Sequence, residues 1–170
     1  MIKEDETDSL TWNSIIDNKF STFVIYPNNP HFKKFYDNYF KVFGMAFLDF
    51  ESMTIFIDGK ELLKDGYTSD HIYAIEAHEI AHYILKHNRN EPSVEQEKAA
   101  DAAGIAILEF LKHEEAKKLL INRFFLLYKH DHSIDINLST EEKILLKTYL
   151  KARNDPWWKS TLKFIRFIKK

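Results

Sequence analysis

Short apolar runs alternate with turn-forming residues in the first third of this 170-residue chain. Residues 20–26, 45–50 and 53–58 are short and rich in aromatic, β-branched and other apolar residues, which predicts three strands. The second and third strands are expected to join near Glu51–Ser52. Asp58–Gly59 then predicts another turn.

Longer stretches repeat their apolar residues every three or four positions and predict helices. The first lies between a break at residues 27–30 and Gly44, and we expect its aromatic side chains to belong to the core rather than to a ligand cage: Phe32, Phe35, Tyr36, Tyr39, Phe40 and Phe43. Capping-box patterns at residues 93–96 and 139–142 predict the starts of two further helices, and residues 114–129 have a helical pattern between them.

Strands are therefore expected before most of the helices. This order predicts an α+β fold, with a small antiparallel or mixed sheet and an all-helical C-terminal half. No internal repeat or low-complexity linker divides the chain. We therefore expect a single domain over residues 1–170.

One predicted helix runs from a cap at Ser69 or Asp70 to His87. Neither Gly nor Pro interrupts it, and basic residues near its end suit the negative end of the helix dipole. One stripe of this helix is expected to face inward, and it comprises His71, Ile75, His78, His82 and Leu85.

The same helix carries the first candidate chemistry. His78 and His82 lie about 40° apart on the helical wheel, so both imidazoles can bind one Zn²⁺. Glu79 lies about 100° from His78, where it can reach a water molecule on the ion. A surface helix with two solvated histidines is the alternative, and the next helix decides against it.

A third ligand is available on the helix that the capping box at residues 93–96 opens. Glu97, Asp101, Gly104 and Leu108 share one stripe of that helix. A catalytic zinc site has three protein ligands and one open position, and Glu97 can complete this set. Asp101 can accept the ring N–H of a ligating histidine, and Gly104 with the neighbouring alanines allows two helices to approach closely. We therefore expect one Zn²⁺ per chain, bound by His78, His82 and Glu97.

These residues resemble a known group of enzymes. His78-Glu79-x-x-His82, followed after a short loop by Glu97-x-x-Ala100-Asp101, is similar to the gluzincin zinc metallopeptidases, which have a zincin-like fold. The Glu-x-x-Ala-Asp ending is similar to the CAAX prenyl protease and HtpX-type branch. The small size and the strands before the active-site helix look more like the ImmA/IrrE-type peptidases and the minigluzincins, which usually carry Asn at the position of Asp101.

The resemblance covers about residues 45–110 and has two further implications. In zinc peptidases of this build, the strand before the active-site helix often has a free edge that pairs with an extended substrate, which here is residues 53–58. An ordinary paired strand is the alternative. His87 also matches these groups, but it lies about 140° from His82 on the wheel and is interpreted as a helix-end residue rather than a ligand.

Composition and charge exclude several classes of protein. With 45% hydrophobic residues the chain can form a sizeable core, and its net charge of −2 gives no electrostatic footprint for nucleic acid. The absence of cysteine excludes disulfides and thiolate ligands. The acidic residues 1–8 do not resemble a signal peptide, and no run is long enough for a transmembrane span. We expect an intracellular, cytoplasmic protein without the membrane-embedded gluzincin architecture.

The end of the chain leaves alternatives open. Asp155–Pro156 predicts the start of a last helix, and residues 157–170 are basic with apolar residues on one side. This helix is expected to dock on the domain, or to make a peripheral contact with a membrane surface or an acidic partner. By resemblance to small gluzincins, it could also cover the cleft and keep the enzyme latent. His130-Asp131-His132 lacks a converging third ligand and is interpreted as a solvated loop.

The sequence thus predicts a zinc-dependent endopeptidase acting on a protein or peptide substrate. Glu79 is expected to take a proton from the attacking water and pass it to the leaving amine. The donor that stabilises the oxyanion is left open among Arg123, Tyr128, His113 and His130. The alternatives are a zinc-containing regulatory protein that acts by docking and a protein in which the motif is only structural. An intact Glu79 argues against both, because a structural site needs no general base.

Overall fold

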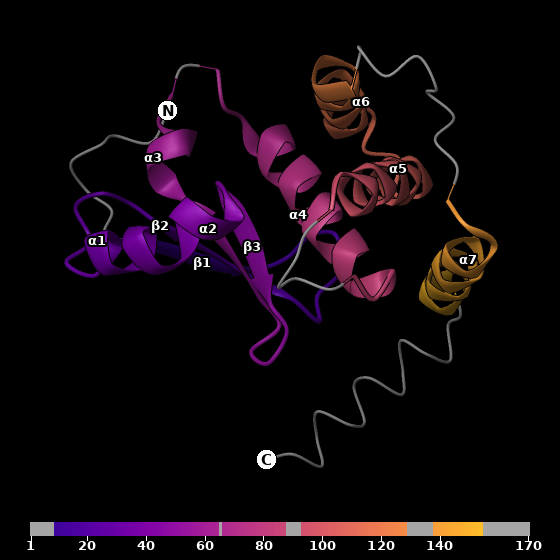
Figure 1. Ribbon diagram of the computed structural model, residues 1–170, viewed down its shortest axis with the longest axis horizontal. Coiled ribbons are helices and arrows are strands. Elements are labelled where there is room, and N and C mark those ends of the chain that lie inside the picture. Colours follow the sequence, from indigo (N-terminus) through magenta and orange to yellow (C-terminus); the bar gives the residue numbers. More distant parts are fainter. Residues whose placement is uncertain (1–8, 65, 88–92, 129–137, 155–170) are drawn as a thin grey trace.

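The computed structural model describes residues 9–64, 66–87, 93–128 and 138–154 (Figure 1). These residues form an α+β fold, as predicted, with a small mixed sheet and a larger helical part. The loop expected at residues 130–132 and the helix expected after Asp155 lie outside the described residues, as do residues 1–8. Within the described part of the chain, no helix has both the length and the apolar character needed to cross a membrane.

The sheet has the strand order β1-β2-β4-β3. Strand β2 pairs antiparallel with β1 and parallel with β4, and β3 and β4 form an antiparallel hairpin. The four strands are β1 (Ser9–Asn13), β2 (Ser21–Ile25), β3 (Ala46–Asp49) and β4 (Thr54–Asp58).

This order corrects the predicted substrate edge. Strand β4, within residues 53–58, lies between β2 and β3 and is hydrogen-bonded on both sides. The edge strands of the sheet are β1 and β3. The expected turn at Asp58–Gly59 is also different, because the Asp58 side chain accepts a hydrogen bond from Lys60 N at 2.9 Å and caps a short helix, α3 (Gly59–Leu62).

The aromatic helix is one continuous helical segment in three parts, α1 (Phe32–Phe35), the π-helical η1 (Tyr36–Phe40) and α2 (Lys41–Phe43). It ends at Gly44, as predicted, where φ is 91° and a side chain would be strained. Its rings gather around Phe47 on the outer face of the sheet. Phe40 is buried there, whereas Tyr39 and Phe43 are 40% exposed, so the predicted core assignment is only partly correct.

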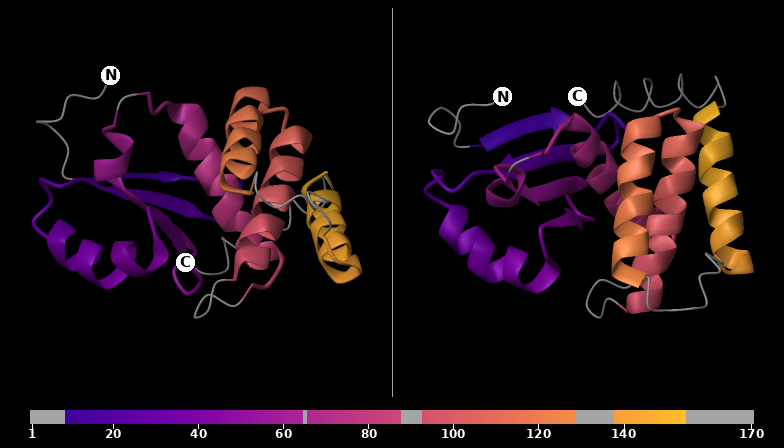
Figure 2. Two further views of the ribbon diagram at one scale, coloured as in Figure 1. Left: turned by 45° about the horizontal axis from the view of Figure 1, so that its top comes forward. Right: turned by 90° about the horizontal axis from the view of Figure 1, so that it is seen from above.

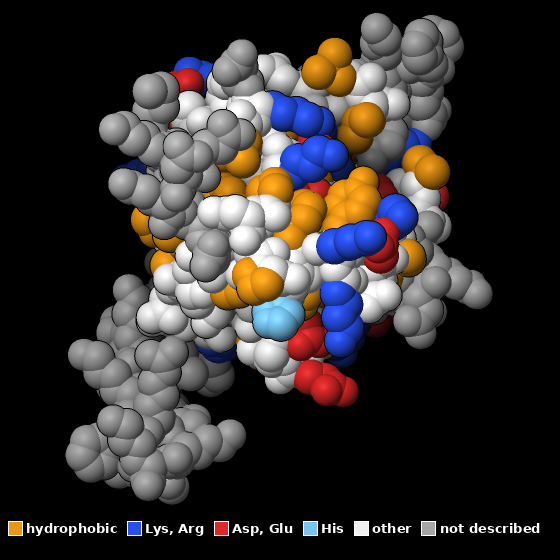
Figure 3. Space-filling model, turned by 90° about the vertical axis from the view of Figure 1, so that its left-hand side faces the viewer, with side chains coloured by type: hydrophobic (Ala, Val, Ile, Leu, Met, Phe, Trp, Pro, Cys, Tyr) orange, Lys and Arg blue, Asp and Glu red, His pale blue; other side chains and the backbone are white. Residues whose placement is uncertain are grey.

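Figure 3 views the molecule from the side of this segment, where hydrophobic side chains lie among Lys and Arg. Apolar side chains are exposed here because the segment covers the sheet with one face only.

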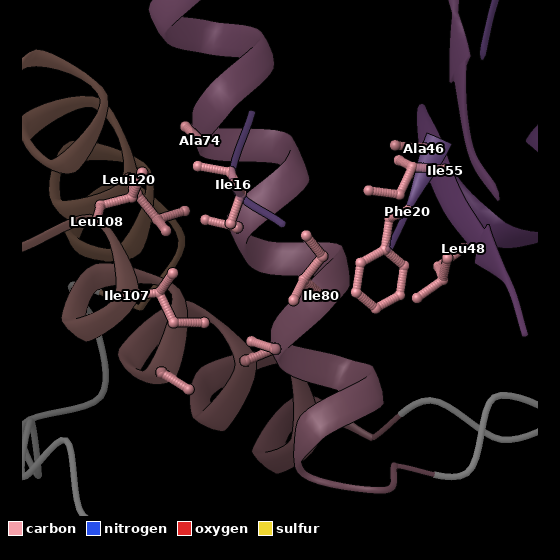
Figure 4. Close-up of a cluster of buried hydrophobic side chains, with 14 of the residues drawn as sticks. Ile16, Phe20, Ala46, Leu48, Ile55, Ala74, Ile80, Ile107, Leu108 and Leu120 are labelled. Atoms are coloured by element: carbon pink, nitrogen blue, oxygen red, sulfur yellow. The ribbon is translucent and has the colours of Figure 1, made fainter. Parts of the chain in front are cut away.

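The opposite face of the sheet packs on helix α4 (Ser69–Ile84). Side chains alternate along each strand, so that Ile55 and Ile57 face the core while Phe56 faces the aromatic segment. Figure 4 shows Ile80 of α4 between Phe20 on the sheet side and Ile107 on the helical side. Helix α4 is therefore buried from two directions.

Three further helices follow in the part of the chain that the structure describes: α5 (Val94–Phe110), α6 (Glu114–Tyr128) and α7 (Thr140–Asn154). Helices α4, α5 and α6 pack against one another, and α7 lies beside α4 and α5 (Figure 2). The predicted capping boxes are confirmed: Ser93 Oγ accepts from Gln96 N at 3.2 Å, and Ser139 Oγ accepts from Glu142 N at 3.2 Å.

The start of α4 differs from the prediction. Its cap is Thr68 rather than Ser69 or Asp70, and the Thr68 backbone N–H donates to His71 Nδ1 at 3.1 Å. His71 thus belongs to the cap, and it is not buried as the inward stripe requires.

Candidate metal centre

Helix α4 brings His78 and His82 together one turn apart. Both residues are 7% exposed, and their Nε2 atoms lie 3.1 Å from each other. Glu79, between them in the sequence, is also 7% exposed. Because the sheet covers one side of this helix and α5 and α6 cover another, the motif lies in the interior rather than on a solvated surface (Figure 1).

Helix α5 adds a carboxylate to this pair. Glu97 Oε2 lies 3.3 Å from His78 Nε2, and Glu97 Oε1 lies 3.3 Å from His82 Nε2. The structure therefore brings together the three residues that the sequence proposes as ligands, and one ligand atom of each lies within 4.8 Å of the others.

Close packing of the two helices allows this approach. A Cβ atom at Gly104 would lie 3.3 Å from His78 N and 3.3 Å from the carbonyl carbon of Ala77. Gly104 is therefore the point at which the backbones of α4 and α5 meet, and Glu97 lies two turns before it on α5.

The three groups fit a zinc ion. Tetrahedral zinc with bonds of about 2.0–2.1 Å separates neighbouring ligand atoms by about 3.3 Å. Here the two Nε2 atoms are 3.1 Å apart, and each lies 3.3 Å from a different oxygen of Glu97, Oε2 for His78 and Oε1 for His82. Two imidazole nitrogens and one carboxylate are an ordinary donor set for this metal. Their lone pairs repel one another at these distances unless a cation or protons lie between them.

Asp101, one turn after Glu97 on α5, contacts the outer nitrogen of His78. Its Oδ1 lies 2.6 Å from His78 Nδ1, and the residue is completely buried. When His78 Nδ1–H donates to this carboxylate, the Nε2 lone pair is left for the metal. Asp101 Oδ2 is buried without a hydrogen-bond partner among the described residues.

Arg123 of α6 joins the same group. Its Nη1 contacts Asp101 Oδ1 and lies 3.3 Å from His78 Nδ1, while its Nη2 lies 3.7 Å from Glu97 Oε2. Of the four candidate oxyanion donors, Arg123 is the one that the described residues place beside the ligands. The His113 ring contacts Tyr73 instead, with ring centroids 5.3 Å apart. His130 and the side chain of Tyr128 lie outside what is described.

His87 has a role that the sequence did not reveal. Helix α4 ends before it, and Lys86 takes a positive φ of 57°, which turns the chain back. His87 is 7% exposed, and its Nδ1 lies 2.9 Å from His82 Nδ1. Its Nε2 lies 3.4 Å from Glu142 Oε1 on α7. It is a helix-end residue, as predicted, and it also contacts a candidate ligand.

Charge and burial shift the pKa values of these groups in the metal-free protein. Burial disfavours the charged form of His78, but the carboxylates of Asp101 and Glu97 outweigh it and raise the pKa of His78 to about 9. Burial also disfavours the charged form of Glu97, yet hydrogen bonds from His78 and His82 lower the pKa of its carboxyl. The pKa of His87 is lowered by burial and by the neighbouring His82.

A pocket of about 440 Å³ lies beside His87, between the end of α4, Phe50 and helix α7. Its other lining residues are Tyr83, Ile84, Lys86, Leu145 and Tyr149. The middle of α7 is therefore not tightly packed against the end of α4.

Comparison with protein-family models, with curated proteins and with solved structures finds no match to this chain. The interpretation of the candidate centre therefore depends on its own geometry and chemistry.

Proposed function

We propose that this chain is a zinc-dependent endopeptidase of the gluzincin type with a zincin-like fold. The observation that carries the proposal is the convergence of His78, His82 and Glu97, with one ligand atom of each within 4.8 Å of the others, next in sequence to the buried Glu79. A purely structural zinc site has four protein ligands, whereas three ligands leave a position open for chemistry.

The proposed division of labour follows from these positions. His78, His82 and Glu97 hold Zn²⁺, which when bound supplies a Lewis acid that lowers the pKa of water and polarises a carbonyl. Glu79 takes the proton from the attacking water on its carboxylate and returns it to the leaving amine. Burial of the surrounding helices limits the access of bulk solvent to this step.

In this proposal, the strand that pairs with a substrate is β3 rather than β4. β3 is an edge strand and packs against α4, which carries the motif. An extended peptide can add to such an edge through backbone hydrogen bonds. We therefore propose Ala46–Asp49, in place of residues 53–58, as the segment that would pair with a peptide substrate.

Metal analysis is the first test. Protein purified without a metal-binding tag should contain about one zinc per chain, and Glu97→Ala should lose most of the affinity because one of three ligands is removed. Glu95→Ala is the matched control, since its side chain is 82% exposed on the same helix. Zinc contents that are equal in the two variants would count against the site.

Replacing Glu79, the proposed general base, distinguishes an enzyme from a protein that acts by docking. Glu79→Gln should keep zinc and thermal stability near those of the parent while turnover of cleaved host proteins, identified by N-terminal labelling, falls by about 10²-fold to 10⁴-fold. His82→Ala should lose both metal and turnover. If Glu79→Gln keeps the full biological effect while His82→Ala abolishes it, the docking alternative replaces the peptidase.

A further inference from the structure

A chain of contacts links helix α7 to the candidate centre. Glu142 Oε1 lies 3.4 Å from His87 Nε2, and His87 Nδ1 lies 2.9 Å from His82 Nδ1. Both histidines are buried, so water cannot readily replace the contact between their rings, whereas the Glu142 side chain is 22% exposed. We propose that Glu142, acting through His87, keeps the proton of the His82 ring on Nδ1 and thereby leaves the His82 Nε2 lone pair for the metal.

The direction of the hydrogen bond between His82 and His87 decides which ring nitrogen of His82 carries its proton. Only one proton fits between the two Nδ1 atoms, so one ring donates the hydrogen bond and the other accepts it. If His82 donates, its proton is on Nδ1 and its Nε2 carries a lone pair toward His78 and Glu97. If His87 donates, a neutral His82 carries its proton on Nε2, where it blocks a metal ion. The zinc-binding arrangement therefore requires His87 to be the acceptor.

Glu142 selects between these two arrangements. An ionised carboxylate can only accept, so it favours the form of His87 with its proton on Nε2. That form has a lone pair on Nδ1 and makes His87 the acceptor from His82. A carboxylate on an outer ring nitrogen is the usual device that orients a metal-binding histidine, and here it acts through a second imidazole.

The carboxylate of Glu142 is itself held in place. Its Oε2 accepts a hydrogen bond from Ser139 N at 2.7 Å within the capping box that starts α7. The other oxygen, Oε1, is therefore free to contact His87. The far end of α7 is tied to the segment after β1, where Tyr149 Oη donates to Asp17 Oδ2 at 2.8 Å and Arg153 contacts the Ile16 carbonyl oxygen. Both ends of α7 are thus fixed although a pocket lies beside its middle.

His87 and Glu142 are therefore positioning residues for His82, as Asp101 is for His78. The inference rests on the proposed zinc site, but it does not require that the site cleave peptides.

Zinc affinity in the full chain tests the inference, measured by competition with a chelator of known affinity. His87→Phe keeps an aromatic ring but removes the acceptor, and it should weaken zinc binding about 10-fold to 100-fold. His87→Asn presents a carbonyl oxygen near the former Nδ1 and should recover most of the zinc affinity that His87→Phe loses. If the two variants bind zinc equally, His87 acts by packing alone and the inference is wrong.

Glu142→Gln tests the selecting role. Glutamine preserves the capping box, but its amide can donate to His87 Nε2 and so favours the blocking arrangement, which should weaken zinc binding about 10-fold. Glu141→Gln, the exposed neighbour on α7, is the matched control and should bind zinc as the parent does. In the His87→Asn background, Glu142→Gln should have no effect, because the imidazole through which it acts is gone.

These results separate the two proposals. Equal zinc affinities for Glu142→Gln and Glu141→Gln overturn the role of Glu142 and leave the zinc site intact. Failure of the parent to bind zinc overturns both proposals. If the His87 and Glu142 variants bind zinc as expected while Glu79→Gln keeps its full biological effect in the host, only the peptidase proposal is overturned.

Discussion

Asp101 Oδ1 on helix α5 lies 2.6 Å from His78 Nδ1 on helix α4. This contact joins the two helices at the same level as the candidate ligands. It orients the His78 ring so that Nε2 faces His82 and Glu97. One buried carboxylate therefore links the packing of the helices to the geometry of the centre.

Replacing Asp101 should weaken zinc binding without abolishing it. Asp101→Ala removes the acceptor of the His78 ring N–H and should lower zinc affinity about 10-fold to 100-fold in a chelator competition. Asp101→Asn retains an oxygen acceptor and should lose less. Equal affinities for the alanine variant and the parent would show that His78 needs no such partner.

Gly104 should tolerate no branched side chain. A Cβ there would lie 3.3 Å from the backbone of Ala77 and His78, and 2.9 Å from Leu120 Cδ2. Gly104→Val should therefore destabilise the fold by about 1–3 kcal/mol in urea unfolding, because α4 and α5 must separate. Ala102→Val, at a partly exposed position on α5, is the control and should cost no more than about 0.7 kcal/mol. Equal losses would contradict a close helix contact.

Glu76 should be essential for attaching α4 to the sheet. It is completely buried and accepts hydrogen bonds from Trp12 Nε1 at 3.1 Å, Ser14 Oγ at 2.7 Å and Thr22 Oγ1. Each buried donor left without a partner costs about 1–3 kcal/mol, so Glu76→Ala should lower the free energy of unfolding by more than about 3 kcal/mol. Exposed Glu109→Ala should change it by less than about 0.5 kcal/mol. A loss below 1 kcal/mol for Glu76→Ala would contradict this role.

The metal-free protein should become less stable as the solution is made alkaline. The pKa of His78 is raised to about 9 in the folded protein, from an ordinary value of 6.5. The folded state therefore binds this proton more tightly than the unfolded state, and the stabilisation is complete below pH 6.5 and lost as the pH rises through about 9. Urea unfolding with chelator present should show this decline, and His78→Gln should flatten it. A parallel decline in His78→Gln would assign the effect to other groups.

Local signals in the sequence predicted much of the fold. The capping boxes at Ser93 and Ser139, the stop at Gly44 and the β3–β4 hairpin depend on residues close together in the chain. The pairing of His78 with His82 is of the same kind, because helical geometry places residues i and i+4 on one face. Such features need only local geometry, which the order of residue types specifies.

Contacts between distant segments were harder to predict. The pattern of β4 is the same for an edge strand and a central strand, and only its parallel pairing with β2 shows that it is central. Strand β1 (Ser9–Asn13) was not predicted, although Leu10 and Trp12 alternate with polar residues, because two apolar positions do not distinguish a short edge strand from a loop. Its place in the sheet depends on β2 and on the Glu76 side chain beneath it.

The sequence by itself determined the α+β class, the helix that carries His78, Glu79 and His82, and the candidacy of Glu97, since each follows from composition or helical periodicity. Only the tertiary structure decided that Glu97 meets the two histidines. It also decided that His87 contacts both His82 and Glu142, the latter 55 positions further along the sequence. The positive φ that brings His87 back occurs at Lys86, which is not a glycine, so the sequence does not signal this turn. The turn itself is closed locally, because the His87 N–H donates to the His82 carbonyl oxygen at 3.1 Å. The contact of His87 with Glu142 requires the packing of a distant helix, which no local pattern encodes.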